Sequence, residues 1–232
     1  MKIFKFGGAS IKDAQGVKNV TTVLKKTGEK DLVVVISAMG KMTNALEEVV
    51  TAHLAKSDTL KDHLLTVETY HYDILKELFP NKEHAIYKAV SGLLDQLKGF
   101  LTSSKSKNHA FVYDQIVSYG ELISTTIVST YLSEENIKNT WLDVRGCIKT
   151  DDNYRDAKVD WEVTQKRIID KVHPTGITVT QGFLGAEHEN NFTTTLGREG
   201  SDYTAAIFAY CLNGESVTIW KDVPGVLNAD PR

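Results

Sequence analysis

Five consecutive apolar residues, Leu32-Val33-Val34-Val35-Ile36, constrain the fold of this chain more than any other feature. Four of them are β-branched. A short run of this kind is typical of a strand that is buried on both faces of a parallel sheet. The run stops at Ser37-Ala38-Met39-Gly40, a turn made of small residues. The segment therefore predicts a central strand that ends in a tight, open loop.

The rest of the chain alternates between short apolar strands and amphipathic helices. Further strands are predicted at 2–6, 141–144, 177–180 and 216–220, and helices at 13–26, 113–132, 161–172 and 202–212. Residues 43–104 have a mostly helical pattern and predict a helical insertion over one end of the sheet. This alternation predicts an α/β domain, with an open, mostly parallel sheet sandwiched between helices. At 232 residues the chain is long enough for one large domain.

Composition narrows the possible partners. The formal net charge of −3 gives no basic excess of the kind that nucleic-acid binding requires. No apolar run approaches the roughly 18 residues of a membrane span, and no signal peptide is recognisable, so we expect a cytoplasmic protein. The 2 cysteines and 7 histidines have no metal-ligand spacing, and no protein-bound metal site is predicted.

Glycines and small polar residues follow the predicted strands. Gly7, Gly8 and Ser10 come after the first strand, and Ser37 to Gly40 after the second. Ligands of open α/β sheets bind outside the carboxyl ends of the strands, and small residues there let backbone N–H groups approach a phosphate. Neither a G-x-x-x-x-G-K-[ST] nor a G-x-G-x-x-G pattern occurs, so nucleotide binding would use neither standard loop.

The segment 193–202 is the densest functional candidate. Gly197 and Gly200 frame Arg198 and Glu199, and Ser201 is predicted as the N-cap of the following helix. A helix N-terminus attracts anions. The alternative is a glycine-rich turn with a helix cap, in which Arg198 and Glu199 pair with each other in solvent.

Two charged residues outside this segment are also candidates. Lys5 lies in the first strand, two residues before the glycine turn, and could reach phosphates over the strand end. The alternative is an ordinary edge lysine. Glu121 follows Tyr119-Gly120 and opens an otherwise apolar helical turn. Its alternative is a solvated acid in a first helical turn.

Four blocks, in order and with fitting spacing along the whole chain, resemble the amino acid kinase family and, within it, the aspartate kinases. The blocks are Lys5-Phe6-Gly7-Gly8-Ala9-Ser10, Ser37-Ala38-Met39-Gly40 with Thr43-Asn44, Gly197-Arg198-Glu199-Gly200-Ser201-Asp202, and Trp220-Lys221-Asp222-Val223-Pro224-Gly225-Val226 with Asp230-Pro231-Arg232. The resemblance implies the amino acid kinase, or carbamate kinase-like, fold. It also implies transfer of the γ-phosphoryl group of Mg-ATP to the β-carboxylate of L-aspartate, the first step of lysine, threonine and methionine biosynthesis.

The resemblance implies roles for individual residues. Lys5 and Asp202 would be catalytic, with Lys5 neutralising charge on the phosphoryl group. The residues that would bind aspartate are Thr43, Glu121, Arg198, Gly200 and Ser201, with Arg198 at the α-carboxylate and Glu121 near the ammonium. The residues that would bind the nucleotide are Lys5, Gly7, Gly8, Ser10, Lys221, Asp222, Leu227 and Arg232.

The chain also departs from the family pattern. Ala9 stands where a hydroxyl residue is usual, and Glu199 replaces a glycine, so Glu199 should point away from the substrate or pair with Arg198. The family's kinase domain continues beyond the segment that ends at Arg232, and regulatory ACT domains follow it. We therefore expect a domain truncated at its C-terminal end, weakly active or inactive alone, and a homo-oligomer. Two alternatives stay open: another amino acid kinase, and a non-catalytic ligand-binding fragment.

Overall fold

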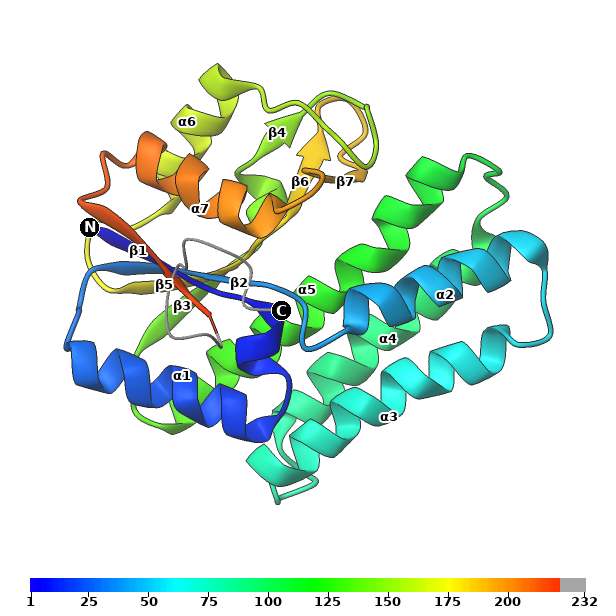
Figure 1. Ribbon diagram of the computed structural model, residues 1–232, viewed down its shortest axis with the longest axis horizontal. Helices are drawn as coiled ribbons and strands as arrows, with labels where there is room; N and C mark the ends of the chain where they lie inside the picture. The colour runs from blue at the N-terminus through cyan, green and yellow to red at the C-terminus, as the bar shows by residue number, and fades with distance from the viewer. Residues whose placement is uncertain (222–232) are drawn as a thin grey trace, which may run out of the picture.

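The computed structural model describes residues 1–221 of the 232-residue chain. Its largest sheet has five strands in the order β3-β5-β2-β1-β8, and every neighbouring pair is parallel. The predicted open parallel sheet is therefore confirmed (Figure 1). These strands are β1 (Lys2–Phe6), β2 (Leu32–Ile36), β3 (Asn139–Leu142), β5 (Ile177–Gln181) and β8 (Ser216–Trp220).

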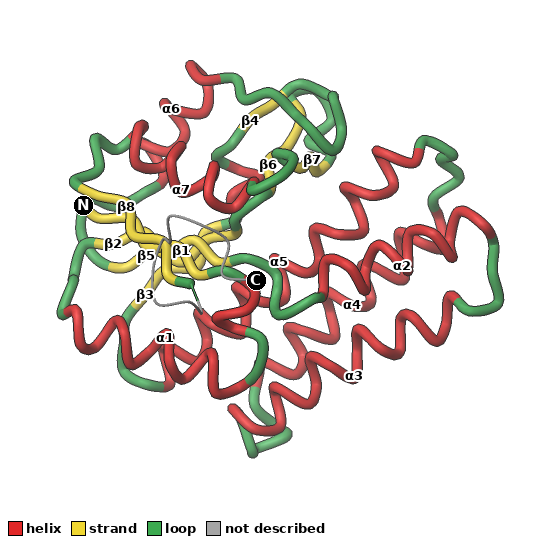
Figure 2. The backbone as a smooth tube through the Cα atoms, viewed as in Figure 1, coloured by secondary structure: helices red, strands yellow, loops and turns green. Residues whose placement is uncertain are grey.

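Helices cover both faces of this sheet (Figure 2). Phe4 and Phe6 of β1 join one hydrophobic core cluster, which includes residues of α1 and of the long helices. Ile3, on the opposite face of the same strand, joins a second cluster with residues of α6 and α7. All five residues of β2 are buried, as expected for a strand covered on both sides. These helices are α1 (Ala14–Thr27), α6 (Trp161–Lys171) and α7 (Gly200–Cys211).

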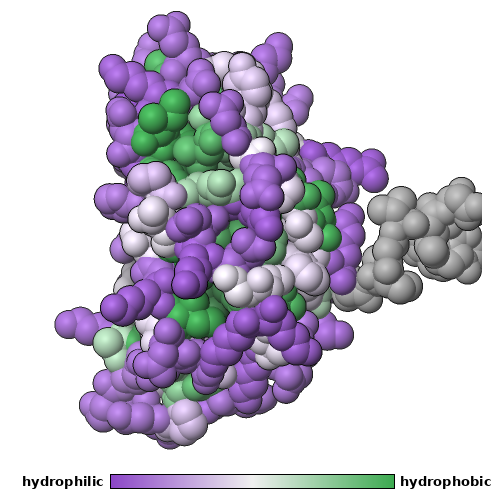
Figure 3. All heavy atoms as spheres, turned by 90° about the vertical axis from the view of Figure 1, so that its left-hand side faces the viewer, coloured by the Kyte–Doolittle hydropathy of each residue, from purple (hydrophilic) through white to green (hydrophobic). Residues whose placement is uncertain are grey.

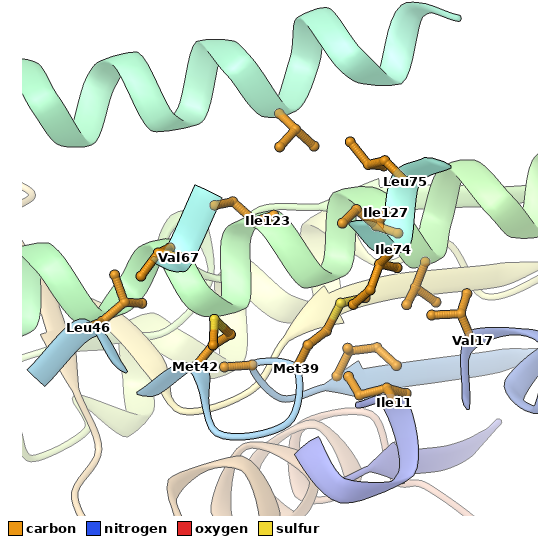
Figure 4. Packing of buried hydrophobic residues seen from close by; sticks show 14 of the residues in the cluster. Ile11, Val17, Met39, Met42, Leu46, Val67, Ile74, Leu75, Ile123 and Ile127 are labelled. Carbon is orange, nitrogen blue, oxygen red and sulfur yellow. The ribbon is translucent and has the colours of Figure 1, made fainter. Parts of the chain in front are cut away.

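The predicted helical insertion is confirmed as a group of long helices beside the sheet (Figure 1). Met42, Leu46 and Val67 of the insertion join Met39 of the loop after β2 in one core cluster (Figure 4). Burying each such side chain stabilises the fold by roughly 1.5–3 kcal/mol. The insertion is therefore anchored next to the end of a central strand. The insertion consists of α2 (Met42–Ala55), α3 (Leu60–Leu78) and α4 (Ala85–Ser103), and the helix predicted separately at 113–132 follows it as α5 (His109–Glu134).

A second, small sheet was not predicted from the sequence. β4 (Lys149–Thr150) pairs in parallel with β6 (Leu184–Glu187), and β7 (Thr193–Thr195) pairs antiparallel with β6. The strand predicted at 141–144 also lies two residues earlier, as β3. Val144 instead begins a short 3-10 helix, Val144–Gly146. Asp143 is its N-cap, and the Asp143 side chain accepts a hydrogen bond from the Arg145 N–H.

β8 is the edge strand of the sheet within residues 1–221, and two of its apolar residues are exposed there, Val217 at 40% and Ile219 at 41%. Figure 3 shows the face that lies on the left of Figure 1, where hydrophobic patches alternate with hydrophilic side chains. Among residues 1–221, no helix is both long enough and apolar enough to cross a membrane.

Candidate functional site

The loops that follow β1 and β2 touch each other at glycines. The Gly40 N–H donates a hydrogen bond to the Gly8 carbonyl oxygen over 3.0 Å. A Cβ on Gly8 would lie 2.6 Å from the carbonyl oxygen of Ala38, so only glycine fits there without displacing backbone. The two strand ends therefore form one continuous small-residue rim.

Lys5 is buried beside this rim and forms an ion pair. Its side chain is 9% exposed, and its Nζ lies 2.5 Å from Oδ1 of Asp202, in the first turn of α7. The alternative of an ordinary edge lysine is wrong, because β1 lies between β2 and β8. Asp202 is 22% exposed, so it is chiefly the buried Lys5 charge that needs this partner and is held in place by it.

Glu121 is buried in the middle of α5 and is only 2% exposed. Its Oε1 accepts a hydrogen bond from the Ala38 N–H over 3.2 Å, whereas its Oε2 has no partner among residues 1–221. Burial raises the pKa of this carboxyl group to about 8. The alternative of a solvated first-turn acid is therefore wrong.

These groups line one cavity of about 450 Å³. It brings together seven of the residues predicted for the site: Lys5, Gly8, Thr43, Glu121, Arg198, Gly200 and Ser201. The other lining residues are Ser37, Ala38, Gly40, Tyr113, Arg155, Phe183, Thr195, Gly197 and Glu199.

The other predicted residues lie around the cavity or outside the described part of the chain. Asp202 does not line the cavity, but it forms an ion pair with Lys5, which does. Gly7 and Ser10 belong to the same loop as Gly8 but do not line the cavity, and the Ser10 hydroxyl donates to the Trp220 carbonyl oxygen over 3.4 Å. Lys221 directly follows β8 and is exposed. Three predicted nucleotide contacts, Asp222, Leu227 and Arg232, fall outside the described residues.

The start of α7 differs from the prediction. Glu199, not Ser201, is the N-cap; its backbone is left-handed, with φ 55°. The helix begins at Gly200, so Ser201 lies inside its first turn and against Gly182 of the β5–β6 loop. The predicted N-cap role of Ser201 is therefore wrong. Arg198 and Glu199 are both exposed, and within residues 1–221 no ion pair joins them, so the solvent-paired alternative is also wrong.

Sequence reasoning missed the side of the cavity formed by Tyr113, Arg155 and Thr195. The Arg155 guanidinium lies over the Tyr113 ring, 4.2 Å from its centroid. Burial raises the pKa of Tyr113 to about 12. Buried Asp114 accepts hydrogen bonds from the backbone N–H groups of Arg155 and Thr195, over 3.0 and 2.9 Å. Its pKa is nevertheless raised to about 6, because burial outweighs these bonds. No sequence motif marks these residues.

The cavity suits a zwitterionic ligand, which carries both a negative and a positive group. Lys5, Arg155 and Arg198 contribute three cationic groups, and guanidinium groups bind carboxylates with charge-assisted hydrogen bonds. The unpartnered oxygen of Glu121 would accept a hydrogen bond from an ammonium group. Among the described residues, no three His, Cys, Asp or Glu side chains are grouped to hold a metal ion.

Curated relatives of this chain are aspartokinases. Lysine-sensitive aspartokinase 3 of Escherichia coli is 32% identical over 235 residues, which cover 99% of this chain and 51% of the relative. Aspartokinase 1 of Arabidopsis thaliana chloroplasts is 32% identical over 238 residues, covering 99% and 41%. The chain thus spans about half the length, or less, of these relatives.

The fold is shared with a solved structure. The crystal structure of E. coli aspartokinase III in complex with aspartate and ADP matches this chain with a TM-score of 0.86 and 30% identity. The match covers 97% of this chain and 50% of the aspartokinase III chain. A family model for the amino acid kinase family matches residues 1–232. With this match over the whole chain, the protein belongs to the amino acid kinase family.

Proposed function

We propose that the protein acts as an aspartate kinase, transferring the γ-phosphoryl group of ATP to the β-carboxylate of L-aspartate. The similarity to aspartokinases along the chain supports this proposal. The observation that carries it is the buried Glu121, whose free oxygen shares one cavity with Arg198 and Lys5. An ammonium site and a carboxylate site next to a phosphate-type loop are what an amino acid phosphorylated on its side chain requires.

In this proposal, the cavity orients aspartate by its two charged main-chain groups. Arg198 binds the α-carboxylate, and Glu121 binds the ammonium group. An ammonium beside Glu121 would lower the raised pKa of this carboxyl group and favour its ionised form. Thr43, Gly200 and Ser201 complete the contacts on either side. The β-carboxylate is then held toward Lys5.

The chemical step needs positioning and charge neutralisation more than covalent chemistry. A β-carboxylate oxygen attacks the γ-phosphorus, the bond from this phosphorus to the bridging oxygen breaks, and ADP leaves. Lys5 neutralises charge on the transferring group, and Asp202 holds Lys5 in place. The loop with Gly7, Gly8 and Ser10 lies against the phosphates.

Nucleotide and metal complete the proposal. Mg²⁺ is taken as part of the substrate Mg-ATP, where it neutralises phosphate oxygens. Lys221, Asp222, Leu227 and Arg232 stay predicted contacts of the nucleotide. A cytoplasmic location and a homo-oligomeric state also stay predictions.

A coupled ADP-release assay tests the function. With Mg-ATP, we expect the weak ADP release of this chain to require L-aspartate and not to occur with L-glutamate, N-acetylglutamate or UMP. We expect Lys5→Met to lower kcat at least about 100-fold, because it removes a preorganised cation at the developing charge. Lys26→Met, at an exposed lysine in the last turn of α1, should leave kcat unchanged.

The outcomes separate the alternatives. Turnover of a different acceptor would assign the protein to another activity within the same family. Binding of aspartate and ATP by calorimetry without any phosphorylation would make the chain a ligand-binding fragment. A Lys5→Met variant with unchanged turnover would refute the catalytic role of this lysine.

A further inference from the structure

Arg155 has a conformation that an arginine rarely adopts. Its φ angle is 73°, in the left-handed region that favours glycine. Its side chain stacks on Tyr113 and lines the cavity. A strained, non-glycine residue at a binding site is worth a functional explanation, since the surrounding structure must compensate for the strain.

Asp114 supplies that compensation and fixes the loop that carries Arg155. Its buried carboxylate accepts hydrogen bonds from the Arg155 N–H, the Thr195 N–H and the Thr195 hydroxyl, at 3.0, 2.9 and 2.8 Å. The Ala157 N–H also donates to the Thr195 carbonyl oxygen over 3.0 Å. The loop between β4 and α6 is therefore tied to β7 at two adjacent points, and Asp114 is a positioning residue.

The same loop packs against the residue before Arg198. A Cβ on Gly197 would lie 2.7 Å from Oδ1 of Asp156 and 3.5 Å from the Arg155 carbonyl oxygen. Arg155 and Arg198 thus come from two loops in direct contact, and both line the same cavity. Neither guanidinium has a carboxylate within 4.0 Å in the described part of the chain. Two guanidinium groups that line one cavity without a carboxylate within 4.0 Å among residues 1–221 favour binding of an anion.

We propose that Arg155 is a second substrate-binding arginine, which joins Arg198 on the carboxylate that is not phosphorylated and so selects dicarboxylates. This inference rests on the proposed function. The guanidinium is planar and already oriented by the Tyr113 ring, so it loses little freedom when it binds a carboxylate. A substrate that lacks this second carboxylate gains nothing from Arg155.

Isothermal calorimetry on the intact chain tests the inference with two probes. L-Aspartate has both carboxylates, whereas β-alanine keeps the ammonium and the accepting carboxylate but lacks the α-carboxylate. Arg155→Gly removes the side chain while glycine accepts the backbone angle. We expect it to weaken aspartate binding about 10- to 100-fold, the usual cost of a lost charged hydrogen bond, and to leave β-alanine binding unchanged.

Lys56→Gly is the matched control. Lys56 is also exposed and also left-handed, with φ 52°, but it lies at the end of α2 and does not line the cavity. This variant should bind both probes like the parent chain. Thermal unfolding of both variants verifies that they are folded.

Each result has one meaning. An aspartate to β-alanine affinity ratio unchanged in Arg155→Gly overturns the inference, even if aspartate is phosphorylated. An equal loss for both probes also overturns it, because Arg155 would then not recognise the α-carboxylate. A ratio that falls without any phosphorylation supports Arg155 and refutes the kinase proposal. A parent chain that binds no aspartate refutes both.

Discussion

Glu121, a proposed binding residue, destabilises the protein that contains it. Its carboxyl group is buried, and one oxygen has no hydrogen-bond partner in the described part of the chain. Ionising such a group inside a protein is unfavourable, which is why its pKa rises to about 8. A structural role would not require an acid here. A ligand with a positive charge would, and it would relieve the cost.

Replacing Glu121 with glutamine should therefore stabilise the protein at alkaline pH. The pKa of Glu121 is about 8 in the folded state and an ordinary 4.5 in the unfolded state. Between pH 4.5 and pH 8 the folded protein therefore keeps a proton on Glu121 that the unfolded protein has lost. The Glu121 contribution to stability is then lost progressively as pH rises from about 4.5 to 8. Glutamine cannot ionise, so we expect Glu121→Gln to raise the free energy of unfolding by on the order of 1–3 kcal/mol at pH 8.

Denaturant unfolding at pH 5, 6.5 and 8 measures this difference, which should shrink toward pH 5. Glu77→Gln, at an exposed glutamate of α3, should show no such pH dependence. Aspartate binding by Glu121→Gln should be weaker at every pH. A variant less stable than the parent chain at pH 8 would contradict the account of Glu121.

Single residues could be predicted from the sequence only where glycines or a strand end marked them. Lys5, Arg198 and the glycines stood next to such marks. Arg155 did not, because its loop has the polar composition of any exposed turn. Ser201 was assigned the wrong local role, because a glutamate adopted the left-handed conformation and moved the helix start to Gly200.

Helix α5 is the element that brings the acid to the cavity, and a glycine permits its approach. A Cβ on Gly120 would lie 2.9 Å from the Cβ of Ala38 and 3.2 Å from Cδ1 of Leu46. The absence of that carbon lets the helix lie directly against the loop after β2. The adjacent residue, Glu121, then reaches the Ala38 N–H.

Two glycine-to-alanine substitutions inside helices distinguish the contribution of packing to stability from that of helix propensity. In Gly92→Ala, on α4, the new Cβ meets nothing within 4 Å, so we expect stabilisation by about 0.5–1 kcal/mol. In Gly120→Ala the same gain is opposed by a clash that costs typically 1–3 kcal/mol. We expect a net loss of stability and a higher KM for aspartate.

Chemical unfolding and steady-state kinetics of both variants check this pair. A Gly120→Ala protein as stable as Gly92→Ala, with the parent KM, would mean that α5 can move away without affecting the site.

Elements were predictable where the hydrophobic period was long or continuous. β2 was predicted at its observed bounds, and the helix predicted at 113–132 is observed as α5, His109–Glu134. The small sheet was missed for a physical reason. β4 has two residues and β7 is a run of threonines, so neither has an apolar pattern, and tertiary pairing with β6 alone makes them strands.

The cavity as a whole is built from segments that are distant in the sequence. Its lining extends from Lys5 in β1 to Ser201 in α7, and includes α5 from the insertion side of the molecule. A ligand in this cavity therefore contacts the sheet, the insertion and the small-sheet layer together. Its binding free energy should be distributed over all of them.

Aspartate should accordingly stabilise the entire domain. At a free concentration 100 times its Kd, we expect the free energy of unfolding to rise by about 2.7 kcal/mol. Hydrogen exchange should slow in the amides of β1, α5 and α7 that open only by global unfolding. Slower exchange confined to one of these elements, with binding confirmed by calorimetry, would show that the layers do not respond as a unit.

The strand order has a consequence for synthesis on the ribosome. β1 is translated first, yet it lies between β2 and β8, and β8 is the last strand described. Until residues 216–220 have left the exit tunnel, one edge of β1 carries unpaired backbone groups. Such an open edge is a site where nascent chains can pair wrongly. The loop at the end of β1 is therefore flanked by β8 only after residues 216–220 have been translated.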